Sequence, residues 1–132
     1  MGPVYLFVYG TLMSGFNNPM ALYLRKNARL TAKGHFNGLL FDMGSYPGAV
    51  YKPDSIHKVF GEVYQVSDDD VIFKKLDIYE GINDPDFNLY ERNIIPVIIN
   101  HKVYNNFVYV LKKTPEVSLI NGGDYNLYIN KK

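Results

Sequence analysis

Three long segments rich in β-branched and aromatic residues constrain the fold of this chain most strongly. They cover residues 58–66, 89–99 and 102–111. The last two flank Asn100-His101, so we expect an antiparallel pair that turns there, with Asn105-Asn106 as the competing turn. Strands of this length can bend around a shared core, which predicts a small barrel or a strongly twisted sheet.

Shorter elements surround these strands. The β-branched and aromatic segment 4–9 predicts a strand, and Asn18-Pro19 is typical of the start of a short helix. Residues 29–41 alternate weakly between polar and apolar and contain two glycines, which indicates a bent strand or a strand pair. Loops are expected at 42–48, at 82–88, and in the tail from Lys112, which contains Gly122-Gly123-Asp124-Tyr125.

The clearest helix begins at Ser67. Ser67 and Asp70 resemble a capping box, with Asp in place of the usual Glu. An apolar stripe at helical spacing follows, and Gly81 is suited to end the helix. The sequence shows no internal repeat and no linker, so we expect one domain over residues 1–132.

Composition narrows the class of protein. The chain of 132 residues is 47% hydrophobic and 20% charged, the balance of a soluble globular domain, and a net charge of +1 gives no strong attraction to nucleic acid or anionic membrane. The longest apolar run, 94–99, is too short to span a bilayer, and no signal peptide is evident. The absence of cysteine excludes disulfides and thiol nucleophiles and fits a reducing cytoplasm, where we expect the protein.

The segment Tyr9-Gly10-Thr11-Leu12 is a candidate binding loop, because it follows the first strand at a glycine. One interpretation is a simple strand-to-loop turn with a glycine at positive φ. The other is that the amides after Gly10 bind a carboxylate or an oxyanion. Tyrosine is abundant, with 12 residues, and its rigid apolar body and polar tip suit the wall of a small-ligand pocket.

Glu80 is the candidate acid–base residue, because it stands at the end of the second helix beside its apolar stripe. A helix C-terminus carries partial negative charge, so a carboxylate there should have a raised pKa. Asp77 can raise this pKa further if it shares the same face, but we favour a surface or capping contact for Asp77.

Few other residues are candidates for a functional site. Tyr90 and Arg92 share one strand face, and Arg92 can either bind a substrate carboxylate or pair with Glu80 or Glu91. The three histidines have no metal-ligand spacing, and phosphate-loop, Rossmann and nucleophile-elbow motifs are missing from the sequence. We therefore expect neither a metal nor a cofactor.

The motifs together resemble the γ-glutamylcyclotransferase-like proteins, which include the AIG2-like group and the γ-glutamylamine cyclotransferases. They occur in the family's order from about Val4 to Tyr125: Val8-Tyr9-Gly10-Thr11-Leu12, Tyr46-Pro47-Gly48, Gly61-Glu62-Val63-Tyr64, Leu76-Asp77-Ile78-Tyr79-Glu80-Gly81, Tyr90-Glu91-Arg92 and Gly123-Asp124-Tyr125. One departure is Met13-Ser14, where many relatives carry basic residues. The resemblance implies an α+β fold, a small bent mixed β-barrel with two or so flanking helices.

The resemblance also implies an activity and a site. A γ-glutamyl amide or amine would be cyclised to 5-oxoproline and a free amine, with Glu80 as catalytic acid/base. The γ-glutamyl or 5-oxoproline moiety would be held by the loop of Tyr9, Gly10, Thr11 and Leu12, with Tyr46 and Tyr125 as pocket walls. Tyr90 and Arg92, which share one strand face, are further candidates for substrate contact. The leaving group stays open among an amino acid, a polyamine, a lysine side chain and a biosynthetic intermediate.

Two alternatives belong to other functional classes. The first is a non-catalytic protein of the same fold that binds a small ligand. The second is a single-stranded nucleic-acid binder, because a barrel rich in Tyr and Phe can stack bases. The near-neutral charge argues against the second, so we expect a small-molecule partner and no nucleic-acid or membrane partner.

Overall fold

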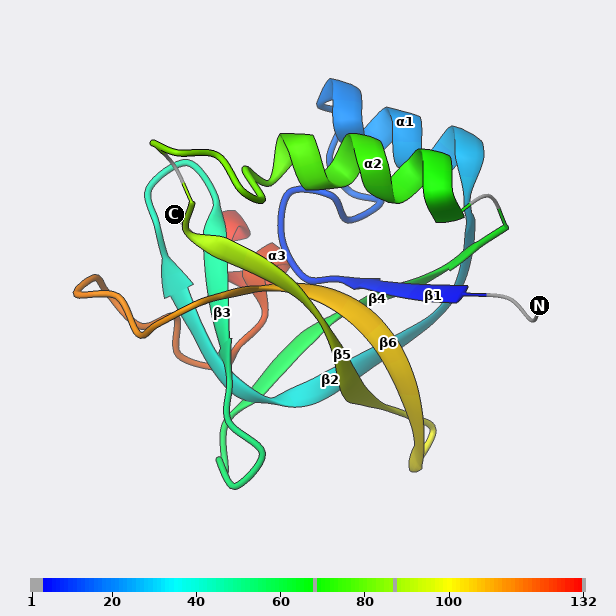
Figure 1. Ribbon diagram of the computed structural model, residues 1–132. Coiled ribbons are helices and arrows are strands. Elements are labelled where there is room, and N and C mark those ends of the chain that lie inside the picture. Colours follow the sequence, from blue (N-terminus) through cyan, green and yellow to red (C-terminus); the bar gives the residue numbers. More distant parts are fainter. Residues whose placement is uncertain (1–3, 68, 87, 132) are drawn as a thin grey trace.

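The computed structural model describes residues 4–67, 69–86 and 88–131, with only the backbone of residues 69 and 70. Long bent strands wrap into a barrel, and helices pack against its outside (Figure 1). The elements are β1 (Val4–Val8), α1 (Pro19–Asn27), β2 (Arg29–Asp42), β3 (Pro47–Tyr51), β4 (Lys58–Val66), α2 (Asp69–Tyr79), β5 (Tyr90–Ile99), β6 (Lys102–Leu111) and α3 (Tyr125–Asn130).

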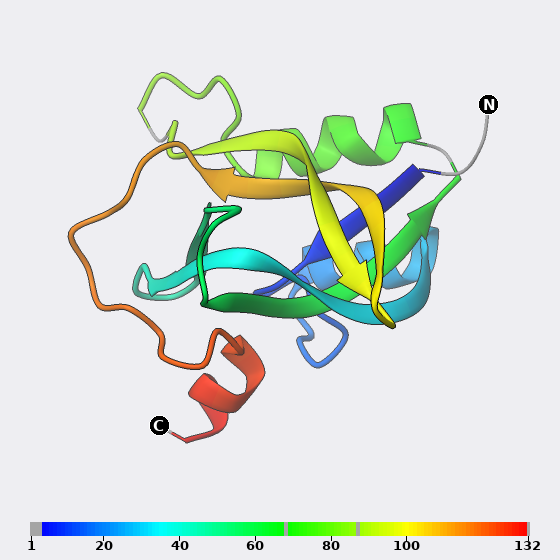
Figure 2. The ribbon, with the colours of Figure 1, turned by 90° about the horizontal axis from the view of Figure 1, so that it is seen from below.

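Five of the strands close the barrel in the order β2-β4-β1-β6-β5. The ring closes where β5 returns to β2, with His35 opposite Ile98. β1 runs parallel to β6, and the other neighbours are antiparallel, so the barrel is mixed. Figure 2 shows the bent strands from below, with α3 on the outside. The expected small mixed barrel is confirmed.

The β5–β6 hairpin turns at Asn100-His101, as the sequence predicts. Ile99 pairs with Lys102, and the two turn residues have φ values of 50° and 68°. Positive φ at both central residues is the requirement of a two-residue hairpin turn that matches strand twist. The competing turn residues, Asn105 and Asn106, lie inside the β6 ladder instead.

β2 is one bent strand and not a strand pair. Its first part pairs with β4 and its last part with β3, with an irregularity between Leu30 and Ala32. Figure 1 shows it curving around the barrel from β4 to β3. β3 was not expected as a strand, because five residues that begin with Pro47 and Gly48 read as a turn and gain their structure from pairing with β2.

The tail also contains more structure than expected. Its loop is attached to the barrel because the Phe60 N–H donates to the Gly123 carbonyl at 2.9 Å. Asp124 then caps a third helix, α3, by accepting the Leu127 N–H at 3.1 Å. A six-residue helix has too short an apolar pattern to stand out in a sequence, so this element was missed.

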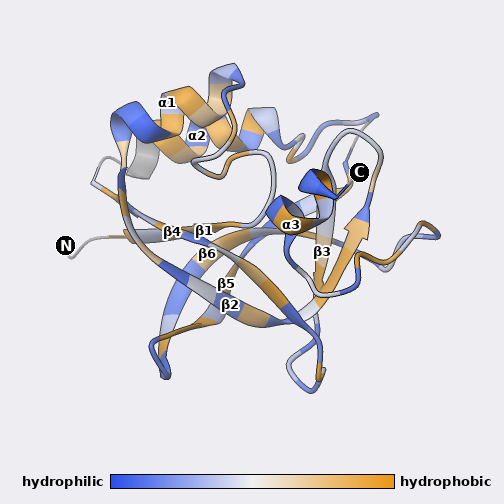
Figure 3. Ribbon diagram, turned by 180° about the vertical axis from the view of Figure 1, so that it is seen from behind, coloured by the Kyte–Doolittle hydropathy of each residue, from blue (hydrophilic) through white to orange (hydrophobic). Residues whose placement is uncertain are grey.

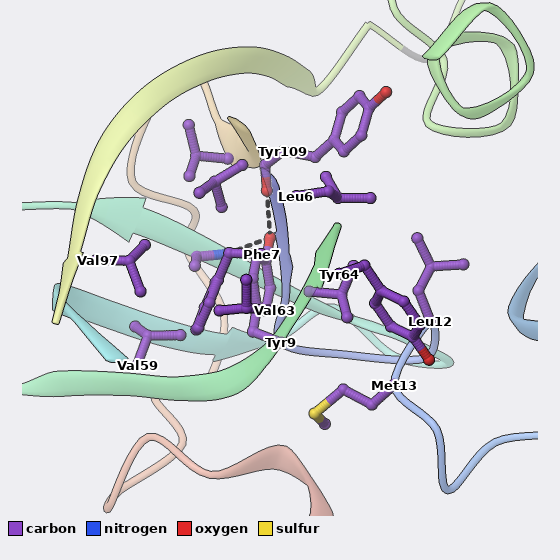
Figure 4. Close-up of a cluster of buried hydrophobic side chains, with 14 of the residues drawn as sticks. Leu6, Phe7, Tyr9, Leu12, Met13, Val59, Val63, Tyr64, Val97 and Tyr109 are labelled. Carbon is purple, nitrogen blue, oxygen red and sulfur yellow. Dashed lines mark hydrogen bonds between the residues drawn. The ribbon is translucent and has the colours of Figure 1, made fainter. Parts of the chain in front are cut away.

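The main core fills the barrel and extends under α1 and α2. Its members from β1, β4, β5 and β6 appear together in Figure 4, and the rings of Phe7 and Phe36 meet edge to face at 5.5 Å. α1 and α2 lie side by side against the barrel, and both mix hydrophobic and hydrophilic residues along their turns (Figures 1 and 3). Their fully buried Leu24 and Leu76 belong to this core.

α2 begins at Asp69, close to the expected start. The capping contact expected between Ser67 and Asp70 involves a side chain that lies outside the described residues. The end of the helix is described in full and, as shown next, it determines where Glu80 lies.

Candidate active site

The candidate binding loop is anchored at its first residue. The Tyr9 hydroxyl donates to the Tyr109 carbonyl at 2.7 Å and accepts the Ala49 N–H at 3.1 Å, as the dashed lines in Figure 4 show. Burial, with a further contribution from Glu80, raises the pKa of the Tyr9 hydroxyl, so this group stays neutral. Its hydroxyl therefore fixes the loop to β3 and β6.

The next residues form a tight turn in which the backbone carbonyls of Gly10 and Thr11 accept hydrogen bonds. The Met13 N–H donates to the Gly10 carbonyl at 3.0 Å, and the Asn18 side chain donates to the Thr11 carbonyl at 2.8 Å. The same Asn18 side chain caps α1 by accepting the Ala21 N–H. Across the described residues, no hydrogen bond takes up the amides of Gly10, Thr11 or Leu12, so these N–H groups are available to a ligand.

A buried carboxylate holds the far side of the loop. Glu62, only 7% exposed, accepts the Ser14 N–H at 2.6 Å and the Ser14 hydroxyl at 2.8 Å. Arg25 of α1 donates to the carbonyls of Ser14 and Phe16 at 3.1 and 2.7 Å. Ser14, the departure from the family pattern, thus supplies two donors to an acidic group. Glu62 was expected only as part of a motif, because its partner Ser14 lies 48 residues away and no local pattern reveals such a contact.

Gly10 lies where the loop passes β3. A β-carbon at Gly10 would lie 2.6 Å from Cγ of Pro47, closer than packed atoms tolerate, whereas one at Gly15 would meet ordinary contacts at 3.6 Å. We expect Gly10→Ala to displace the loop and to weaken ligand binding by about tenfold, since small misplacements cost affinity and rate.

Calorimetric titration of both variants with 5-oxoproline checks this prediction. Gly15→Ala is the matched control in the same loop and should bind like the wild type. Equal affinities for Gly10→Ala and Gly15→Ala would contradict the idea that the loop position matters for binding.

Glu80 occupies the C-cap of α2. The Gly81 N–H donates to the Ile78 carbonyl at 3.1 Å and the Ile82 N–H to the Asp77 carbonyl at 2.9 Å, the paired bonds of a Schellman motif. Gly81 has a φ of 74°, as its expected role at the end of the helix requires. The motif ends the helix at a fixed residue and so fixes the backbone that carries Glu80.

Burial raises the pKa of the Glu80 carboxyl to about 7. The direction agrees with the expectation from the sequence, and the cause is the loss of water around the buried carboxylate. Asp77 is turned elsewhere: it accepts the Tyr109 hydroxyl at 2.6 Å and lies 3.5 Å from Nη1 of Arg92. Instead of the surface or capping contact expected for Asp77, its side chain contacts Tyr109 of β6 and Arg92 of β5.

One cavity of about 610 Å³ joins the loop and Glu80. Although they are some seventy residues apart in the sequence, both contribute to its wall, together with Tyr46 and Tyr90. No Lys or Arg is among the described lining residues, which are Phe7, Val8, Tyr9, Gly10, Thr11, Leu12, Asn18, Ser45, Tyr46, Pro47, Ile78, Tyr79, Glu80, Gly81, Asp84, Leu89, Tyr90 and Tyr109.

Two of the tyrosines expected at the site, Tyr46 and Tyr90, adjoin each other. The ring centroids of Tyr46 and Tyr90 are 6.3 Å apart. The Tyr90 hydroxyl donates to the Pro47 carbonyl at 3.0 Å, and burial raises its pKa, with smaller contributions from the neighbouring Tyr9 and Glu80. Tyr46 is partly exposed, whereas Tyr90 is buried and fixed.

Two expected site residues lie away from this cavity. The Arg92 guanidinium packs over the rings of Phe73 and Phe107, 4.5 and 5.2 Å from their centroids, and pairs with Asp77. Tyr125 is buried at the start of α3, where its ring stacks on Phe16 at 5.8 Å. Neither residue is among the described residues that line the cavity, and strand-face and loop patterns do not reveal these local partners. Their contact with substrate stays a prediction.

In the described part of the chain, neither a metal-holding cluster nor a membrane-spanning helix is found. No group of three or more His, Asp and Glu side chains is arranged to hold a metal ion there. None of its helices has the length and apolar character needed to cross a membrane.

Comparison with known proteins places the chain in a family. Residues 6–127 match the family described as gamma-glutamyl cyclotransferase, AIG2-like. A relative from Vibrio cholerae, provisionally named a γ-glutamylcyclotransferase, is 34% identical over 91% of this chain and 93% of its own. A relative from Methanocaldococcus jannaschii with the same provisional name is 31% identical over 94% of this chain and 97% of its own.

A solved structure shows the same fold. The AIG2-like protein of Mus musculus superposes with a TM-score of 0.73 at 26% identity, covering 95% of this chain and 89% of that protein. The family indicated by the sequence motifs is thus confirmed by sequence and by structure. The chain belongs to the AIG2-like γ-glutamyl cyclotransferase family.

Proposed function

We propose that this protein cyclises a γ-glutamyl amide or amine, releasing 5-oxoproline and the free amine, with Glu80 as general base and general acid. The observation that supports this proposal most is the shared cavity. It brings a carboxyl group with a pKa of about 7 to the same space as a loop whose Gly10, Thr11 and Leu12 amides have no hydrogen-bond partner among the described residues. A proton-transfer group and a set of donors are the parts that an acyl transfer requires.

The proposed reaction is intramolecular. The α-amine nitrogen of the substrate attacks its own γ-carbonyl carbon, a five-membered lactam forms, and the bond from that carbon to the leaving nitrogen breaks. An ammonium group has no lone pair for the attack, so Glu80 accepts its proton and then delivers a proton to the leaving amine. A carboxyl group with a pKa of about 7 suits both steps near neutral pH, because both of its forms are well populated.

The loop amides have two candidate roles in this reaction. They can hold the α-carboxylate of the substrate, or they can stabilise the negative charge that develops on the γ-carbonyl oxygen. Both roles benefit from a loop fixed in advance, and contacts from Asn18, Glu62 and Arg25 hold the loop's carbonyl and hydroxyl groups. Much of the rate gain would come from holding the folded substrate conformer.

The cavity is large enough for more than the γ-glutamyl group. Its volume of about 610 Å³ lies within the usual range of small-molecule sites. We assign Tyr46 and Tyr90 to its walls as substrate contacts. The leaving amine would occupy the remaining space.

A mass-spectrometric screen for 5-oxoproline tests the function. The panel contains γ-glutamyl conjugates of α-amino acids, of polyamines and of the lysine side chain, each incubated with wild type and with Glu80→Gln. Release of 5-oxoproline that depends on Glu80 supports the proposed enzymatic activity. Binding of 5-oxoproline without turnover of any conjugate would favour the non-catalytic binding protein instead.

The pH dependence follows from the Glu80 pKa. Glu80 must be ionised to accept the proton, so kcat/KM should rise with pH, with a limb centred near 7, and should fall about tenfold for each further unit below it. The measurement pairs the pH–rate profile with a carboxylate-resolved NMR titration of Glu80 in the same buffers. A Glu80 titration centred near the ordinary value of about 4.3 would contradict this prediction.

A further inference from the structure

Tyr109 makes hydrogen bonds to both halves of the proposed site. Its carbonyl accepts the Tyr9 hydroxyl at 2.7 Å, and its own hydroxyl donates to Oδ1 of Asp77 at 2.6 Å. Tyr9 directly precedes Gly10 of the loop, and Asp77 stands three residues before Glu80. In Figure 4 the Tyr109 ring extends away from the bond to Tyr9, so the two contacts leave β6 in different directions.

The contact to Asp77 is supported from its other side. Nη1 of Arg92 lies 3.5 Å from Oδ1 of Asp77. The guanidinium packs over the rings of Phe73 in α2 and Phe107 in β6, so it is held in place. Nη1 of Arg92 makes no hydrogen bond within the described residues, so its contribution is the attraction of a nearby positive charge for the Asp77 carboxylate.

The end of α2 has few other attachments to the barrel. Leu76 is fully buried, but Ile78 and Tyr79 are 74% and 47% exposed. Beyond the helix, Ile82 packs against the core, and the hydrogen bond that the Tyr109 hydroxyl donates to Asp77 is a part-buried polar connection between the last turn and β6. Without it, the last turn would be held by apolar packing alone, which is not directional.

We propose that Tyr109 is a positioning residue that fixes the loop amides and the Glu80 carboxyl relative to each other. The inference rests on the proposed function, since it concerns the geometry of that site. Tyr109 also lines the cavity, but the role assigned to it acts through Tyr9 and Asp77. Nothing in the sequence distinguishes Tyr109, because a tyrosine within a β-strand is usually a core residue.

Kinetics on four variants test the proposal. Tyr109→Phe and Asp77→Ala should each lower kcat by about 10- to 100-fold with a smaller change in KM, because misplacement of a reacting group costs rate more than binding. Asp77→Asn should recover most of this loss, since its amide oxygen still accepts the hydroxyl. Tyr104→Phe, an exposed tyrosine on the same strand, is the control and should match wild type.

The kinetics of the double variant test whether Tyr109 and Asp77 act as one unit. Tyr109→Phe combined with Asp77→Ala should be no slower than either single variant, because both remove the same contact. Losses that simply multiply would overturn the proposal. If Tyr109→Phe fails to fold, Asp77→Ala and Asp77→Asn still test the proposal. Equal rates for these two variants would overturn the positioning role.

A readout without turnover separates this proposal from the proposed function. Glu80 should titrate lower in Tyr109→Phe than in wild type, by about one pKa unit, because a loosened turn lets water reach the carboxylate. If wild type releases no 5-oxoproline from any conjugate, the proposed function fails while this NMR titration still tests the positioning. An unchanged Glu80 pKa together with an unchanged kcat would overturn the positioning role.

Discussion

Replacing Glu80 by glutamine should lower the turnover of a γ-glutamyl conjugate by about 10²–10⁴-fold, the usual worth of a general acid–base group. Glutamine keeps the shape and cannot exchange the proton. The C-cap is formed by the backbone bonds of Gly81 and Ile82, so the fold should be retained.

The measurement is the rate of 5-oxoproline release, with circular dichroism to confirm folding. Glu116→Gln is the matched control, because Glu116 is an exposed carboxylate in the tail and should leave the rate unchanged. Turnover of Glu80→Gln within a few-fold of wild type would remove Glu80 from the mechanism.

Replacing Gly123 by alanine should lower the free energy of unfolding by about 2–5 kcal/mol, combining strain at positive φ with overpacking. Gly123 has a φ of 67°, and a β-carbon there would lie 1.7 Å from the Lys58 carbonyl oxygen. The Phe60 N–H bond to Gly123 would have to shift as well.

Gly122→Ala is the matched control for this stability effect. Gly122 also has positive φ, at 89°, but a β-carbon there would have nothing within 4 Å. Gly122→Ala should lower the free energy of unfolding only by the cost of the positive φ, about 1–2 kcal/mol. Equal midpoints for the two variants in urea unfolding would contradict the prediction, because they would show that the close approach of Gly123 to β4 adds no cost.

The barrel could be predicted from the sequence because its long strands carry their own signals. Residues 58–66, 89–99 and 102–111 were expected as strands and form β4, β5 and β6 with small differences at their ends. The turn at Asn100-His101 could be predicted because both residues tolerate positive φ. β3 and α3 could not, because both are short and depend on pairing or capping by distant parts of the chain.

The candidate site was only partly predictable, for a related reason. The loop after Tyr9 and the end of α2 have local signatures, and the cavity brings them together. Tyr109 and Glu62 act through partners that lie 100 and 48 residues away, and no local pattern reveals them. The packing partners of Arg92 and Tyr125 could not be predicted, because an arginine on a strand and a tyrosine after Gly-Gly-Asp suit a pocket as well as they suit packing.

The pairing of β1 with both β4 and β6 has a consequence for how this protein gains its activity. β1 lies at the start of the chain, yet its neighbours in the barrel are some 60 and 100 residues away. Contacts this distant form slowly, because the chain loses loop entropy before they stabilise it. The Tyr9–Tyr109 bond cannot form until β6 has been synthesised. The cavity should therefore be among the last features to mature on the ribosome, and a nascent chain that ends before β6 should lack it.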